Sequence, residues 1–198
     1  MKNIIKIASV AAVALAITQT LQAVPITGSV TFNGTVQLGN AGSPVSSVVN
    51  ATEVLNWYGN NGVGNPYVAS SSGSLAGASF QPVTFATPWT FGPQSALWSY
   101  LASNGDTFTF SLTHINSDTV SGSPAALTIT GSGTITATGP VAFDPTAGTW
   151  AFSTQDPNAG GVFSFSAASG ALPDGGATAM MLGLALSGVA LLKKKLVA

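Results

Sequence analysis

The chain has 198 residues with 5 Lys and Arg, 6 Asp and Glu and no Cys, which suits one domain with extensions. Every cation is a lysine among the first six or the last six residues: Lys2, Lys6, Lys193, Lys194 and Lys195. A middle region without Lys or Arg cannot neutralise phosphates, so nucleic-acid binding and electrostatic docking on anionic lipid are excluded for it. Without Cys, disulfides, thiolate nucleophiles and zinc–thiolate sites are excluded as well.

The first 23 residues have the pattern of a secretory signal peptide. Lys2 and Lys6 precede an apolar run of eleven residues, Ile7–Ile17, and a more polar stretch then ends in the small residue Ala23. The apolar run is too short to cross a bilayer core of about 30 Å as a helix. We therefore predict a signal peptide over residues 1–23 that signal peptidase removes after Ala23.

A second apolar segment lies near the other end of the chain. Ala177–Leu192 is 16 residues long and uncharged, and Lys193, Lys194 and Lys195 follow it directly. As a helix it reaches about 24 Å, which spans a bilayer core when lysines snorkel to the interface. Lysines after an apolar stop stay cytoplasmic, so the rest of the chain faces away from the cytoplasm. We predict a transmembrane helix with a lysine stop here.

The segment Leu172, Pro173, Asp174, Gly175 and Gly176 comes directly before that helix. Proline lacks a backbone donor and the glycines lack Cβ, so we expect an extended, sterically bare stretch. Together with the apolar helix and the basic end, this motif resembles the PEP-CTERM sorting signal in its V-P-D-G-G or V-P-D-S-G variant. Leu172 stands where that variant usually has Val, and lysines stand where Arg is common. The resemblance covers residues 172–198 and concerns the route of the protein rather than an activity.

The resemblance implies export by a Gram-negative bacterium. Proteins with such tails cross the inner membrane, are held there transiently by the C-terminal helix, and are processed near the motif by an exosortase. They are then released to the cell surface or to the extracellular polysaccharide matrix. The implied partners are therefore signal peptidase, an exosortase-type enzyme and the inner membrane.

Residues 24–171 are predicted to form one β-domain, which is large enough to bury a core without disulfides. Apolar residues alternate with Thr and Ser in several segments, a pattern typical of half-buried strands. Val30, Phe32 and Leu38 belong to one such strand, or to a hairpin that turns at Asn33 and Gly34. The other segments run through Phe108, Phe110 and Leu112; through Leu127, Ile129 and Ile135; through Trp150 and Phe152; and through Phe163 and Phe165.

The fold class predicted from this pattern is all-β, with an antiparallel two-sheet sandwich as the most economical architecture. A β-helix is the alternative, although no fixed repeat period demands one. Gly131 and Gly133 on the inward side of their strand indicate a bulge or a close backbone approach. The segment 56–78 is rich in Gly, Ser and Asn and is expected to form surface loops.

The inventory of catalytic groups is small, and we expect a protein that is not an enzyme. His114 continues the even-numbered inward face of its strand and is expected to be a hydrogen-bonded histidine at the sheet margin. The acids Asp106, Asp118, Asp144 and Asp156 stand in sequences typical of turns. Asp156–Gly160 resembles part of a calcium loop, but Ala167 occupies the position of the bidentate Glu. We therefore expect no catalytic residue, no metal and no cofactor.

Aromatic side chains provide the one candidate binding feature. Trp57 and Tyr58 precede the polar stretch Gly59–Gly62, and flat rings beside amides are typical of sugar-binding faces. Two functions remain open. The first is a non-enzymatic surface or matrix component, and the second is a carbohydrate-binding module for neutral exopolysaccharide with Trp57 and Tyr58 as glycan contacts.

Overall fold

The computed structural model describes residues 23–59, 62–155 and 163–169. These residues form strands and short 3-10 turns and contain no α-helix. None of the helices in this part of the chain is long and apolar enough to cross a membrane. The predicted signal peptide, apart from Ala23, and the predicted sorting segment 172–198 lie outside the described residues.

Twelve strands are described, several of them very short. In chain order they are β1 (Val24–Pro25), β2 (Gly28–Asn40), β3 (Ser43–Pro44), β4 (Glu53–Tyr58), β5 (Tyr67–Ser71), β6 (Val83–Phe85), β7 (Gln94–Leu101), β8 (Thr107–Ser121), β9 (Ala126–Thr138), β10 (Phe143–Asp144), β11 (Thr146–Gln155) and β12 (Phe163–Ser169). The 3-10 turns η1 (Val48–Asn50) and η3 (Gly73–Leu75) lie between them.

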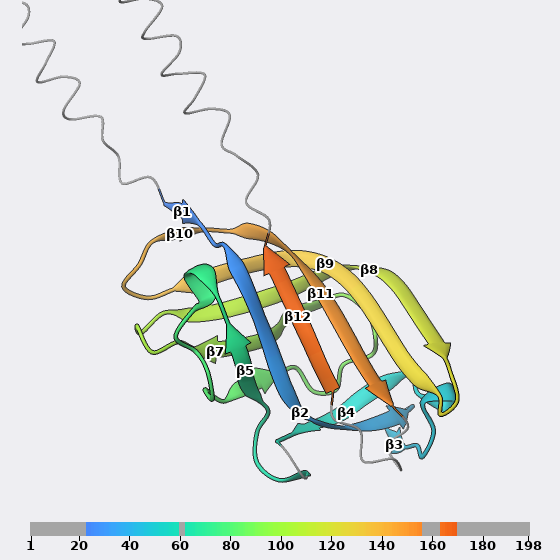
Figure 1. The fold of residues 1–198 in the computed structure, drawn as a ribbon. Helices are drawn as coiled ribbons and strands as arrows, with labels where there is room; N and C mark the ends of the chain where they lie inside the picture. Colours follow the sequence, from blue (N-terminus) through green and yellow to red (C-terminus); the bar gives the residue numbers. More distant parts are fainter. Residues whose placement is uncertain (1–22, 60–61, 156–162, 170–198) are drawn as a thin grey trace, which may run out of the picture.

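Two open, antiparallel sheets make up most of the domain (Figure 1). The first has the strand order β11-β9-β8-β7-β6. In the second, β2 pairs with β12 along one edge and with β5, β4 and β3 along the other. A short parallel pair, β1 with β10, joins the start of the described chain to the segment before β11. The all-β class is confirmed. The neighbouring strands of both sheets run antiparallel, whereas the β-helix alternative requires parallel strands stacked coil upon coil.

The inner faces of the two sheets share one aromatic core. Phe32 of β2 packs against Phe85 of β6 and Trp98 of β7, with ring centroids 5.4 and 5.0 Å apart. Within the first sheet, Trp150 of β11 stacks on Phe110 of β8 across the intervening strand β9. Edge-to-face and offset contacts of this kind add to the stabilisation from burial alone. The alternating apolar residues of the sequence therefore meet between two layers.

Strand β2 runs without interruption through Asn33 and Gly34. The alternative of a hairpin turn at this dipeptide is wrong, because both residues pair with β12 inside one continuous ladder. Val30, Phe32 and Leu38 are buried, as their period of two predicts.

Strand β8 departs from its alternation at His114. The register with β9 shifts between Leu112 and His114, and again between Ile115 and Ser117. Each β-bulge adds one residue to β8 and so exchanges its two faces. His114 is therefore exposed and Ile115 turns toward the core, so the predicted inward position of His114 is wrong.

The glycines opposite these bulges allow the close approach of the two strands. A Cβ on Gly133 would overlap the backbone carbonyl of Ser111, and a Cβ on Gly131 would lie 2.6 Å from Leu112 Cδ1. The bulge or close approach predicted at Gly131 and Gly133 is thus present, on the partner strand β8.

The segment 56–78 is more ordered than the sequence suggests. It contains the end of β4, all of β5 and the turn η3, and Val68 and Leu75 are buried in the core. The expectation of surface loops over this whole segment is wrong, because β5 pairs with β2, and the Gly, Ser and Asn content of the segment does not indicate this pairing.

Candidate functional site

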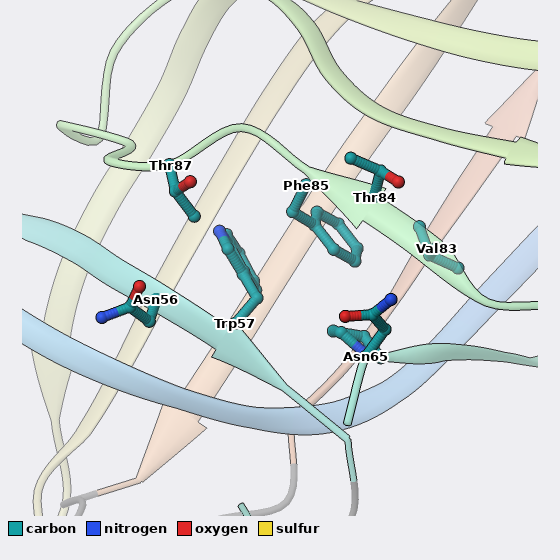
Figure 2. A pocket seen from close by; sticks show the side chains of 8 residues that line it. Asn56, Trp57, Asn65, Val83, Thr84, Phe85 and Thr87 are labelled. Carbon is teal, nitrogen blue, oxygen red and sulfur yellow. The ribbon is translucent and has the colours of Figure 1, made fainter. Parts of the chain in front are cut away.

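A cleft of about 290 Å³ lies where the edge of one sheet meets the edge of the other. Strand β4 forms one wall and β6 the opposite wall, with residues 65–66 at one end (Figure 2). Its lining consists of Asn56, Trp57, Asn65, Pro66, Val83, Thr84, Phe85 and Thr87. The volume is at the lower limit of typical small-molecule sites.

The floor of the cleft is aromatic and fixed. Trp57 is buried, and its ring stacks on Phe85 with centroids 4.4 Å apart and planes at 20°. Its indole Nε1 donates a hydrogen bond to the carbonyl of Ala86 at 3.0 Å. The stack and the hydrogen bond together fix the orientation of the ring, which Figure 2 shows beside Phe85.

A bulge in β4 places Trp57 there. The pairing with β2 shifts between Gln37 and Leu38, which leaves Leu55 as an extra residue between Val54 and Asn56. Val54 and Trp57, three positions apart, therefore both face the core.

The rim of the cleft is polar and uncharged. Asn56, Asn65, Thr84 and Thr87 are exposed. The side chains of Asn56 and Thr84 lie on the outer faces of β4 and β6, where Asn56 Nδ2 donates to Gln37 Oε1 at 2.7 Å. No lining residue carries an ionisable acid or base. Amides and hydroxyls over an apolar floor can bind a neutral polyhydroxylated ligand, and they offer no group that would act as a general acid or base at neutral pH.

Of the two predicted glycan contacts, the structure brings only Trp57 to the cleft. Tyr58 is the next residue of the strand, and successive side chains point to opposite faces. Its hydroxyl lies 3.5 Å from Gln37 Oε1 on the outer side of β4. Trp57 and Tyr58 therefore do not form one shared platform.

Sequence reasoning did not single out Asn65, Thr84 or Thr87 as members of a site. Thr84 and Thr87 lie far from Trp57 in sequence, and Asn65, eight residues after it, stands in a segment rich in Asn and Gly. All three are neutral residues of common types, so nothing local marks them. Their meeting depends on how the segment after β5 returns to β6, where Val83 N–H donates to the carbonyl of Pro66 at 2.8 Å.

The carboxylates are dispersed over the domain. Asp106 is buried in a turn and accepts hydrogen bonds from Val141 N–H at 3.1 Å and Asn104 Nδ2 at 2.7 Å, so its predicted turn role is confirmed. Asp118 and Asp144 lie in strands β8 and β10, so the prediction of turns at these two positions is wrong. Asp156 lies outside the described residues.

The described residues contain no group of three or more His, Cys, Asp or Glu side chains that could hold a metal ion. His114 is exposed on the outer face of β8, paired with Ser132. Glu53 is buried at the start of β4 and accepts a hydrogen bond from Gly42 N–H at 2.6 Å.

The comparisons with known proteins concern the C-terminal end of the chain. Residues 173–196 match the VPDSG-CTERM motif family. The chain thus carries a PEP-CTERM-type C-terminal sorting signal, which contains Pro173, Asp174, Gly175 and Gly176. No curated protein and no solved structure matches the chain.

Proposed function

We propose that this protein is a non-enzymatic component of the cell surface or extracellular matrix, exported and then processed by an exosortase-type enzyme. The sorting signal at residues 173–196 carries the proposal, because such a signal implies export and a transient membrane-bound stage. Signal peptidase would remove residues 1–23 after Ala23, and Lys193, Lys194 and Lys195 would hold the tail at the cytoplasmic side until processing.

The surface of the domain suits such a role. Thr84, Ser99, Thr109 and Thr136 form one row across four neighbouring strands of the first sheet, on its outer face. Further Thr and Ser residues continue this face along β8 and β9. Hydroxyls keep the sheet face hydrated without charge, which supports a passive matrix component better than a partner for ionic polymers.

Replacement of Pro173, Asp174, Gly175 and Gly176 by alanines in a bacterium that carries the sorting enzyme tests this route. We expect the variant to stay in the membrane fraction while the unaltered chain is released. Leu172→Val, which moves the motif toward its common form, is the matched control and should be released normally. Release of the alanine variant at the rate of the unaltered chain would contradict the proposal.

The cleft favours a second candidate function, the binding of neutral exopolysaccharide. Its lining combines an indole, amides and hydroxyls without charge, and its volume suits one sugar unit. Anionic polymers fit less well because the described residues contain no Lys or Arg to pair with them.

Affinity electrophoresis against several neutral polysaccharides tests this second function. We expect retardation in at least one gel, reduced by Asn65→Ala and by Thr87→Val. Thr128→Val, on the outer face of β9 away from the cleft, should migrate like the unaltered protein. If no polysaccharide retards the protein, the second function is rejected while the first stands.

A further inference from the structure

Both ends of the described domain leave it at the same place. Strand β12 runs antiparallel to β2, and its last residue, Ser169, pairs with Gly28 at the start of β2. Val24, directly after the predicted cleavage position, begins β1 only four residues before Gly28. Figure 1 shows β1 and the head of β12 at one end of the sheets.

We call this place the terminal end and define it by residues 23–28, 101–106 and 138–146 together with Ser169. Contacts tie these segments together. Val24 N–H donates to the carbonyl of Ala142 at 3.4 Å, and Val141 N–H donates to Asp106 Oδ1 at 3.1 Å. The carbonyl of Asp106 in turn accepts from Ala102 N–H at 2.8 Å.

The chain between the terminal end and the sorting signal is short. Strand β12 ends at Ser169, and the matched signal begins at residue 173. The predicted transmembrane helix begins at Ala177, and at 3.3–3.6 Å per residue the eight steps from Ser169 to Ala177 span at most about 29 Å. While the tail is in the membrane, the terminal end therefore cannot move far from the bilayer surface.

The chemistry of the terminal end is compatible with that surface. Val24, Leu101 and Val141 are large apolar side chains exposed there. Asp106 is fully buried, and Asp144 is the one exposed carboxylate among the described residues of this end. The described residues contain no Lys or Arg, so attraction to lipid phosphate does not contribute.

We propose that the terminal end lies directly against the lipid bilayer while the protein is anchored, with Val24, Leu101 and Val141 facing the lipid. This inference rests on the proposed membrane-bound stage. The short tether supplies a high effective concentration of the bilayer, so a weak apolar contact is populated without specific affinity. Cleavage near Pro173 removes the tether. The domain then leaves the membrane, because its apolar contact with the lipid is too weak to hold it there.

The absence of Cys from the chain allows a direct test by single-cysteine labelling. Val141→Cys reports on the terminal end. Val120→Cys is its matched control, because both valines are 43% exposed and Val120 lies near the β8–β9 hairpin at the opposite end of the sheet. The full chain is produced with export in a host without the sorting enzyme and reconstituted into phosphatidylcholine vesicles. Each variant is then reacted with a polymer-linked maleimide.

We expect Val141→Cys to react about tenfold more slowly in vesicles than in detergent, as a contact populated about nine-tenths of the time requires. Val120→Cys should react equally fast in both. A spacer of twelve Gly and Ser residues between Ala171 and Leu172 should restore fast labelling of Val141→Cys. Equal labelling of Val141→Cys in vesicles and detergent, or protection that survives the spacer, would overturn the proposal.

Flotation of the same vesicles separates this inference from the proposed function. A chain that floats with the vesicles but shows no protection at Val141→Cys disproves only the orientation. A chain that does not float lacks the membrane-bound stage, so the proposed route and the orientation both fail.

Discussion

The terminal end and the opposite end of the domain each contain one buried carboxylate that accepts a hydrogen bond from a backbone N–H. At the terminal end this is Asp106, which has no exposed surface and accepts from Val141 N–H and Asn104 Nδ2. At the opposite end it is Glu53, 6% exposed, which accepts from Gly42 N–H in the turn after β2.

The difference between the two carboxylates shows how a domain without cations holds the chain segments at its two ends together. Burial of a carboxylate is costly unless it is paired or hydrogen-bonded, and no Lys or Arg is present among the described residues to pair with either. Asp106 has the larger set of donors and connects two chain segments 35 residues apart. The terminal end, where both processing steps are proposed, is thus tied together more strongly than the opposite end.

Of the substitutions that test this comparison, Asp106→Ala should cause the largest loss in the free energy of unfolding. It removes two hydrogen bonds to a carboxylate and leaves the N–H of Val141 without its acceptor, so we expect a loss of about 3 kcal/mol in the free energy of unfolding. Urea denaturation measures it. Asp118→Ala, an exposed carboxylate of β8, is the matched control and should leave the midpoint unchanged. Equal midpoints for the two variants would refute the role of Asp106.

Glu53→Ala should have a smaller effect at the opposite end. The substitution removes the acceptor of the Gly42 N–H, and water can reach this turn, so we expect a loss of about 1–2 kcal/mol in the free energy of unfolding. The same urea titration measures it. The comparison would be reversed if Glu53→Ala destabilised the domain more than Asp106→Ala does.

Tyr100→Phe should have the smallest effect at neutral pH. The Tyr100 hydroxyl is buried beside the terminal end and has no hydrogen-bond partner among the described residues, so its removal should cost nothing or stabilise the fold by less than about 1 kcal/mol. Loss of more than this would show that the hydroxyl has a partner.

The pH dependence of stability should change with the same substitution. Burial raises the pKa of Tyr100 above its ordinary value of 10.0. The unfolded chain therefore loses this proton at lower pH than the folded domain, and stability falls as the pH rises above about 10. Tyr100→Phe should make that fall shallower in thermal unfolding measured between pH 9 and pH 11. An unchanged slope would contradict the assignment.

The sequence predicts the strands well where their alternation is regular, as in β2 and the first half of β8. It does not predict the side on which His114 lies, because a β-bulge exchanges the faces without any change in composition. The glycines Gly131 and Gly133 indicate where such an irregularity occurs, but not which partner strand contains it.

The cleft and the terminal end depend on long-range pairing that no local pattern contains. Thr87 meets Trp57 only because the chain after β6 runs back along β4, where Trp89 pairs with Val54, and Ser169 meets Gly28 only through the register of β12 with β2. The sorting signal, in contrast, is a local motif at residues 173–196, so the sequence is sufficient to find it.

Intact mass spectrometry of the protein released into the medium tests the central claim most directly. Two processing steps at the terminal end predict one species that begins at Val24 and ends within or directly before the segment Leu172–Gly176. A released protein that still contains Lys193, Lys194 and Lys195 would contradict the account.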